Sequence, residues 1–243
     1  MATQDKTQEI LEKKGEHVQN MFDRIAGWYD FLNHFLSLGI DRRWRKKLIR
    51  AAGLKDGDRV LDVATGTGDL ALSVLKACDC RVTGMDVSEK MMEAGRKKMR
   101  KKGKEGSVKF IAGRAEEIPF EDNTFDAVTV AFGVRNYTDL EKGLKEMLRV
   151  LRPGGITAIL EFSKPARQPL KAVYSFYLFH LLPWAGKLFS GDKYAYTYLP
   201  ASIERFPQRE DFLEIMERCG FRGCRYQTYT GGIVAAYFGE KKN

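Results

Sequence analysis

The sequence predicts an α/β fold in which a mostly parallel sheet is covered by helices on both faces. Three observations indicate this architecture. Short apolar runs alternate with helical patterns through the middle of the chain, a glycine turn at residues 66–68 follows the first run, and Asp86 closes the second. An open α/β sheet binds a nucleoside with a glycine turn after one strand and an acidic residue at the end of the next strand.

The N-terminal part is expected to be helical and to lie outside the sheet. Apolar residues recur at helical spacing between Ile10 and Ile25, which is typical of an amphipathic helix. An aromatic stretch at residues 28–38 and a basic helix ending near Ala52 follow it. We expect residues 1–52 to form a helical lid.

The next hundred residues hold the alternating elements of the sheet. Ser88 is placed to cap the helix that follows Asp86, and Pro153-Gly154-Gly155 stops a helix before a strand. The expected strands are residues 59–64, 81–86, 108–112, 127–131 and 157–162, and the expected helices are residues 70–77, 88–102 and 140–151.

The C-terminal pattern is different. A helix at residues 209–219 ends at Gly220, and two β-rich runs, residues 224–229 and 233–238, flank Gly231-Gly232. Turn glycines between adjacent strands predict an antiparallel hairpin, which brings the sheet to seven strands.

Residues 172–189 interrupt the alternation. They hold one charge, Lys187, and seven aromatic residues counting His180. Pro183 leaves eleven residues before the break, too few to span a bilayer. The segment is either the core of an inserted helical subdomain at residues 165–206 or the wall of an apolar substrate pocket that also touches a membrane.

Charge and cysteine usage limit the class of protein. Of the 243 residues, 41 are basic and 32 acidic, with basic clusters at residues 42–47 and 96–102. Solvated helix faces, an anionic membrane surface and nucleic acid all remain compatible with this charge.

Cys78, Cys80, Cys219 and Cys224 form no Cys-x-x-Cys pair, so we expect reduced cysteines and no metal site. The first twenty residues are polar and charged, so we expect no signal peptide.

The glycine turn leaves two cofactors open by pattern alone. With Ala71 at its third position the turn satisfies the dinucleotide fingerprint, which keeps NAD open. Asp62, four residues before the first glycine, would repel a pyrophosphate but suits an ammonium group such as that of S-adenosylmethionine. We therefore favour S-adenosylmethionine, with Asp86 accepting hydrogen bonds from both ribose hydroxyls. The contacts are expected from Asp62, Gly66, Thr67, Gly68 and Asp86.

Further motifs run along most of the chain. They include residues 21–26 with Tyr29-Asp30, residues 132–136 (Phe-Gly-Val-Arg-Asn) with Thr138-Asp139, and residues 160–165 and 196–207. These motifs resemble the C-methyltransferases of ubiquinone and menaquinone biosynthesis, within the class I methyltransferases. Residues 115–120 and 149–155 are shared by many small-molecule methyltransferases, so they carry no information on the substrate.

The resemblance implies a Rossmann-like fold with one methyltransferase domain over residues 1–243. It also implies S-adenosylmethionine-dependent C-methylation of a prenylated quinol, either demethylmenaquinol or the corresponding ubiquinone precursor. The nucleophile would be a ring carbon made electron-rich by an ortho phenolate, and the protein must favour that phenolate and align the ring.

The resemblance also suggests roles for individual residues. Arg135 would stabilise the phenolate, because a nearby cation lowers the pKa of a phenol, and Asn136 would hydrogen-bond a ring oxygen. Alternatively, Arg135 pairs with a structural carboxylate such as Asp139. Tyr29 would contact the cofactor carboxylate or simply pack, and His180 would relay the ring proton or belong to the core.

Two positions depart from the family's pattern. Arg114 stands where an adenine-binding Asn or Asp is usual, and its guanidinium cannot accept a hydrogen bond. Either the backbone of Ala115 recognises adenine or Arg114 stacks on it. Ala131 replaces a serine of some relatives, which removes one polar contact.

Other functions remain to be compared with quinol methylation. An RNA methyltransferase would fit the charge, but residues 131–136 lack the Asn/Asp-Pro-Pro-aromatic sequence of amino-methylating nucleic-acid enzymes. Another small-molecule methyltransferase and a non-catalytic scaffold complete the alternatives. We expect a cytoplasmic protein that attaches peripherally to anionic membrane through the basic helix with Trp44 and residues 172–189. We expect no nucleic-acid partner, and dimerisation is left open.

Overall fold

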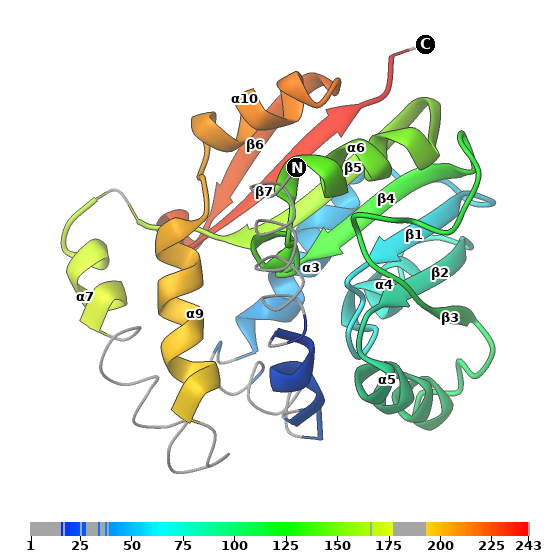
Figure 1. The fold of residues 1–243 in the computed structure, drawn as a ribbon, viewed down its shortest axis with the longest axis horizontal. Helices are drawn as coiled ribbons and strands as arrows, with labels where there is room; N and C mark the ends of the chain where they lie inside the picture. Colours follow the sequence, from blue (N-terminus) through cyan, green and yellow to red (C-terminus); the bar gives the residue numbers. More distant parts are fainter. Residues whose placement is uncertain are drawn as a thin grey trace, which may run out of the picture.

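The computed structural model describes residues 16, 18–24, 26–27, 34, 37, 39–165, 167–176 and 193–242, without the side chains of residues 193–197. Seven strands form one sheet in the order β3-β2-β1-β4-β5-β7-β6, with helices on both faces (Figure 1). The predicted α/β fold is therefore confirmed. The strands are β1 (Arg59–Val63), β2 (Arg81–Asp86), β3 (Val108–Ala112), β4 (Phe125–Ala131), β5 (Leu151–Phe162), β6 (Arg222–Tyr229) and β7 (Val234–Glu240).

The first five strands are parallel, and the last two are antiparallel to their neighbours. β1 pairs with both β2 and β4, so the direction of chain progression reverses beside β1. In open α/β sheets the carboxyl ends of the strands at such a reversal form a ligand-binding crevice. β7 runs antiparallel to β5, and β6 to β7, which confirms the predicted C-terminal hairpin.

Strand boundaries differ from the predicted ones where the backbone is irregular. β1 ends at Val63, because Ala64 has a φ of +52° and already belongs to the turn. β5 begins at Leu151, six residues earlier than predicted, and Leu151 pairs with Phe125 before the register shifts. Gly154, with a φ of +73°, lies within this irregular part and permits it.

The helices begin at the caps that their sequences provide. Ser88 caps α5, because its hydroxyl accepts a hydrogen bond from the Met91 amide at 3.2 Å, as predicted. Asp139 caps α6 through the Lys142 amide at 3.0 Å. The helices are α3 (Ile40–Ala52), α4 (Asp69–Val74), α5 (Glu89–Lys101), α6 (Leu140–Val150), α7 (Leu170–Phe176), α9 (Lys193–Arg205) and α10 (Glu210–Arg218), with short 3₁₀ turns η1 (Val134–Asn136) and η3 (Thr230–Gly232).

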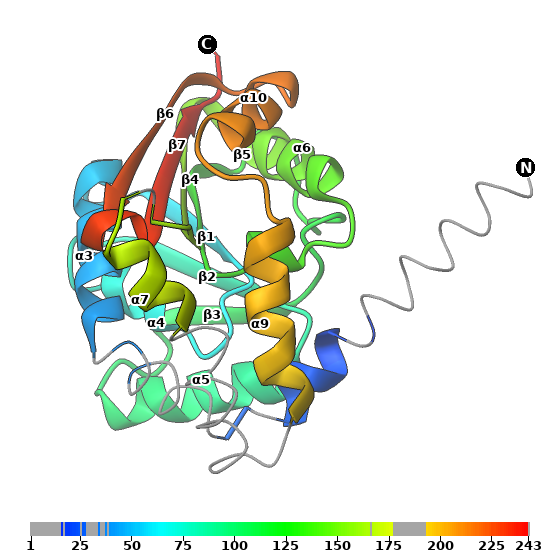
Figure 2. The same cartoon turned by 90° about the vertical axis from the view of Figure 1, so that its left-hand side faces the viewer.

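Two apolar cores pack on the two faces of the sheet. Leu144 of α6 and Phe212 of α10 belong to one core, and Leu48 of α3 and Val74 of α4 belong to the other. Figure 2 shows α3 on one side of the sheet and α6 and α10 on the other. The central strands are therefore covered on both sides, which explains their near-continuous apolar sequences.

Trp44 belongs to the core and not to an exposed surface. Its side chain is buried, and its Nε1 donates a hydrogen bond to Thr230 Oγ1 at 2.8 Å. The prediction that Trp44 helps to contact a membrane is therefore wrong. The helical period of α3 places Trp44 on its buried face, whereas the neighbouring Arg43 and Lys46 are exposed.

A third, smaller core joins the N-terminal helix to the inserted segment. Met21, Tyr174 of α7 and Ile203 of α9 are buried against one another, with Phe22 and Tyr198 packed beside them. In Figure 2 the helical N-terminal residues lie beside α9. The predicted lid and insertion thus share an apolar interior. Most of the aromatic segment, including His180, lies outside the described residues, as does Tyr29.

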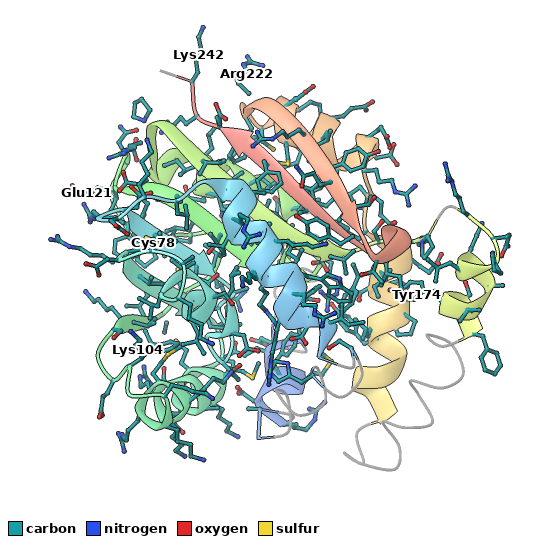
Figure 3. All side chains as sticks on the ribbon, turned by 180° about the vertical axis from the view of Figure 1, so that it is seen from behind. Cys78, Lys104, Glu121, Tyr174, Arg222 and Lys242 are labelled. Carbon is teal, nitrogen blue, oxygen red and sulfur yellow. A yellow bond between two sulfur atoms is a disulfide. The ribbon has the colours of Figure 1, made fainter. Side chains whose placement is uncertain are left out.

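The cysteines are not all reduced. Cys219 and Cys224 are free, as expected, but Cys78 and Cys80 form a disulfide, so the prediction is wrong for this pair. The single intervening residue lies where the chain bends between α4 and β2, and it leaves the two Cα atoms 5.5 Å apart. Figure 3 shows Cys78 on the side of the molecule opposite Tyr174, so this pair is remote from the inserted segment.

Candidate active site

A cavity opens at the carboxyl ends of β1, β2 and β4, where the chain reverses direction in the sheet. Its empty volume, which includes space open to solvent, is about 740 Å³. The N-terminal helix covers it with Val18 and Phe22. The lining also includes Ala64, Gly66, Asp86, Val87, Met91, Gly113, Arg114, Ala115, Glu116, Ala131, Phe132, Gly133, Asn136 and Tyr137.

The glycine turn brings backbone to the floor of the cavity. Gly66 and Gly68 have φ angles of +56° and +77°, which side chains rarely adopt. A Cβ on Gly68 would also lie 2.9 Å from Met99 Cε, so α5 packs directly against the turn. Gly66 lines the cavity, whereas Thr67 and Gly68 lie behind it and face α5.

Asp86 links the turn to the end of β2. One carboxylate oxygen accepts the Gly66 amide at 2.7 Å, and the other accepts the Ser88 amide at 2.9 Å. Burial raises the pKa of Asp86, and the two amide hydrogen bonds oppose that rise. Because a carboxylate oxygen has more than one acceptor site, both oxygens can still accept hydroxyl donors from a ligand in the cavity.

Asp62 lies just below the cavity and does not form part of its wall. Thr65 Oγ1 donates to one carboxylate oxygen at 2.6 Å, and Thr129 Oγ1 donates to the other at 3.0 Å. Burial raises the pKa of Asp62 to about 6, although both hydroxyls oppose the rise. Val63 and Ala64, which follow Asp62 in the chain, do line the cavity. Asp62 can therefore act on a bound ligand by its charge, without direct contact.

The residues predicted to contact adenine surround one side of the cavity. Arg114, Ala115 and Ala131 all line it. Arg114 forms a backbone bridge with Glu117, and the Glu117 amide donates to Arg114 O at 3.2 Å, so this loop closes in a tight turn. Gly113 donates its amide to Asp86 O at 3.0 Å, so the loop is attached to the strand that carries Asp86.

Arg135 lies at the edge of the cavity in a buried ion pair. Its Nη1 contacts Glu161 Oε1 at 2.8 Å, and its Nε donates to Ser202 Oγ at 3.3 Å. The side chain of Glu161 is fully buried, and its burial raises its pKa despite the adjacent guanidinium. Arg135 thus has a structural carboxylate partner, but the suggested partner Asp139 is wrong, since Asp139 caps α6.

Asn136 lines the cavity beside Arg135 and is held by the inserted segment. Tyr198 on α9 donates its hydroxyl to Asn136 Oδ1 at 3.0 Å. Together with the contact of Ser202 to Arg135, this places α9 directly against the Arg-Asn motif. Glu161, Tyr198 and Ser202 lie within the motifs at residues 160–165 and 196–207, but nothing in the sequence reveals that α9 returns to η1.

The predicted residues therefore fall into groups. Gly66, Asp86, Arg114, Ala115, Ala131 and Asn136 line one cavity; Asp62, Thr67, Gly68 and Arg135 support or border it. Tyr29 and His180 lie outside the described residues.

The chain matches known methyltransferases over nearly its whole length. A model of the ubiE/COQ5 methyltransferase family matches residues 9–241. The ubiquinone/menaquinone biosynthesis C-methyltransferase UbiE of Geobacter sulfurreducens is 47% identical over 233 residues, which cover 95% of this chain and 91% of that protein. The demethylmenaquinone methyltransferase of Bacteroides fragilis is 45% identical and covers 94% of both chains.

The fold also resembles solved structures with other activities. The [4+2]-cyclase SpnF superposes with a TM-score of 0.70 at 20% identity and covers 94% of this chain and 97% of its own. At this identity the likeness concerns the fold alone, and it shows that activity must be argued from the site.

We predict that Asp86→Ala weakens binding of S-adenosylmethionine, the cofactor expected from the sequence, by about 1.5–3 kcal/mol, the scale of hydrogen bonds to a charged group. Glu89→Ala removes an exposed carboxylate nearby on α5 and serves as the control. Calorimetry on both variants measures the effect. An unchanged affinity with a lowered melting temperature would restrict Asp86 to holding the turn.

We also predict a pH dependence of cofactor binding from Asp62. A cationic ligand favours the carboxylate, so the attraction is present above the pKa of about 6 and is lost as the pH falls through it. Affinity for S-adenosylmethionine should therefore drop between pH 7 and pH 5, and Asp62→Asn should flatten that drop. Methylthioadenosine, which lacks the ammonium group, isolates the contribution of Asp86. If both ligands show the same pH profile, Asp62 has no such role.

Proposed function

Because this chain belongs to the ubiE/COQ5 methyltransferase family, we propose that it methylates a ring carbon of a prenylated quinol with S-adenosylmethionine. The substrate class is demethylmenaquinol or the corresponding ubiquinone precursor, as the names of the relatives suggest. One observation carries the proposal: Asp86, suited to a ribose, and Asn136 of the Arg-Asn motif line the same cavity.

The described residues fit the cofactor. Asp86 has acceptor capacity for the ribose hydroxyls, Asp62 offers negative charge below the floor, and Met91 and Val87 supply apolar surface for a base. Bound there, S-adenosylmethionine supplies an electrophilic methyl group. The protein's own task is then to hold and ionise the acceptor ring beside it.

Arg135 is suited to stabilising a phenolate. Its hydrogen bonds to described residues use Nε and Nη1, and Nη2 donates to none of them. Glu161 offsets part of its charge and fixes its orientation. A guanidinium held in this way favours an anionic oxygen placed next to Nη2 without any rearrangement of its own.

Asn136 is suited to orienting the ring. Its Oδ1 accepts the Tyr198 hydroxyl, so its amide group is left to donate into the cavity. We infer that the small core of Met21, Tyr174 and Ile203 begins an apolar compartment for the prenyl chain. The lid and the inserted subdomain would then bind the tail while the sheet binds the cofactor.

The proposal is tested by mass spectrometry of products after incubation with labelled cofactor. The panel contains demethylated naphthoquinols and benzoquinols of several tail lengths and total RNA. Label in a ring carbon of a quinol is expected. Label in RNA alone, or none with cofactor bound, would overturn the proposal. No described residue favours the RNA alternative over the quinol.

We predict that Arg135→Lys lowers kcat by about tenfold or more and changes cofactor affinity far less, because an ammonium lacks the planar fork of guanidinium. Arg135→Ala alone would leave Glu161 buried without its cationic partner, which costs about 3–5 kcal/mol. The Arg135→Gln, Glu161→Gln double variant avoids that cost and should also lose kcat. The loss should shrink as assay pH approaches the quinol's own pKa. Unchanged kcat in the double variant would make Arg135 purely structural.

Peripheral membrane association is a second part of the proposal. None of the described helices is long and apolar enough to cross a membrane. Val173 and Phe176 on α7 are 62% and 55% exposed. Leu170 of α7 packs against Gly231 of η3, and Thr230 of η3 contacts Trp44 of α3, so α7 and α3 flank the same 3₁₀ turn. Arg43 and Lys46 on the outer face of α3 are exposed. An apolar helix face beside basic side chains suits an anionic lipid surface.

We predict that binding to anionic vesicles falls with added salt and with the double variant Val173→Ser, Phe176→Ser. Arg43→Gln with Lys46→Gln should weaken binding further by removing attraction to the lipid headgroups. Arg100→Gln with Lys101→Gln removes equal charge from α5 and is the control. Flotation assays measure the bound fraction. Equal binding to neutral vesicles, or an equal loss in the control, contradicts the proposed surface.

A further inference from the structure

A group of charged residues lies behind the glycine turn, on the side away from the cavity. It contains Asp41 and Arg45 of α3, Asp69 at the start of α4, Lys98 of α5 and His34. The side chains of Asp41 and Arg45 are 3% and 6% exposed, and those of Asp69 and Lys98 are 16% and 15% exposed. Charges that are this deeply buried require partners.

The contacts form a continuous chain from α5 to α3. Lys98 Nζ donates to Thr67 Oγ1 at 2.8 Å and to Asp69 Oδ1 at 2.6 Å. Asp69 Oδ2 lies 3.6 Å from Arg45 Nη2, and Arg45 Nη1 contacts Asp41. His34 completes the chain, with Nδ1 at 2.7 Å from Asp41 Oδ2 and Nε2 at 3.5 Å from Asp69 Oδ2.

The two carboxylates and the two cations in this series of contacts balance in charge. Burial by itself would raise the pKa values of Asp41 and Asp69. The positive charge of Arg45, together with that of Lys98 in the case of Asp69, outweighs burial and lowers both pKa values below their usual range. The three potential metal ligands His34, Asp41 and Asp69 lie within 4.8 Å of one another. Since both carboxylates already contact a guanidinium or an ammonium, a divalent cation would meet net repulsion there. We therefore interpret the cluster as an ion-pair network.

The network holds a segment whose backbone reaches the cofactor cavity at Gly66. Thr67 stands between the two glycines of the turn, and Asp69 directly follows the second. Glycine at positions 66 and 68 gives this backbone many accessible conformations. Lys98 contacts both Thr67 and Asp69, so it connects the turn to α5, and Asp69 connects it to α3 through Arg45.

We propose that Lys98, Asp69 and Arg45 are positioning residues that hold the glycine turn in the conformation that binds S-adenosylmethionine. None of them lines the cavity, so they would act on the cofactor through the turn. The outer pair of His34 and Asp41 keeps Arg45 directed at Asp69. The proposal rests on the cofactor assignment but not on the identity of the quinol.

The test compares Lys98→Met, Asp69→Asn and the double variant with the wild-type protein. Calorimetry gives the Kd for S-adenosylmethionine and for S-adenosylhomocysteine, and steady-state assays give KM and kcat. Each single variant should raise both Kd values by about tenfold, the change that corresponds to about 1.4 kcal/mol. KM for the cofactor should rise much more than kcat falls, and the double variant should be less impaired than the product of the two single effects.

Lys101→Met is the matched control, because Lys101 is an exposed lysine on the same helix. Its Kd should remain that of the wild type. Wild-type affinity in Lys98→Met and Asp69→Asn would overturn the proposal, and so would a fall in kcat and melting temperature with KM unchanged. If Asp69→Asn fails to fold, Lys98→Met alone carries the test. Absence of cofactor binding by the wild type would instead overturn the cofactor assignment.

Discussion

The buried carboxylate of Asp86 joins the two turns on which the rest of the site depends. It accepts one amide from the glycine turn after β1 and one from the residue that caps α5. Ser88, in turn, contacts Asp23 of the N-terminal helix, which carries Phe22 over the cavity. The Asp86 side chain at the end of β2 therefore connects the glycine turn, helix α5 and the N-terminal helix to one another. A buried carboxylate is stable there only because backbone donors satisfy it.

A second buried charge organises the opposite side of the cavity. The Arg135–Glu161 pair connects η1 to β5, and Ser202 adds α9. Such pairs contribute little net stability, since desolvation of both groups offsets their attraction. They do define orientation, because a misplaced partner leaves an unpaired buried charge. We interpret this pair as fixing the direction of Arg135 relative to the acceptor ring, with the inserted segment as a third support.

Several details of the site could not be derived from local patterns. Asp139 was the nearest acidic candidate for Arg135 in sequence, but it caps α6, and Glu161 reaches Arg135 from 26 residues away. Trp44 stands in a run of basic residues, yet the helical period directs it into the core. Cys78 and Cys80 lack any motif of a disulfide, and only the bend between α4 and β2 brings their sulfurs together.

The order and type of most elements follow from the sequence, because alternating apolar runs, caps and turn glycines act over a few residues. Gly66 and Asp86 were recognisable for the same reason, since each belongs to a short segment with strict local requirements, whereas the Arg-Asn motif was recognisable through the family resemblance. The partners of these residues depend on the tertiary structure. Tyr198, Ser202 and Lys98 come from elements distant in the chain, and only the packing of α9 and α5 against the sheet brings them into contact with the site. Hydrogen bonds between distant segments produce no periodic pattern in a sequence, because a suitable donor or acceptor can stand at many different positions along the chain.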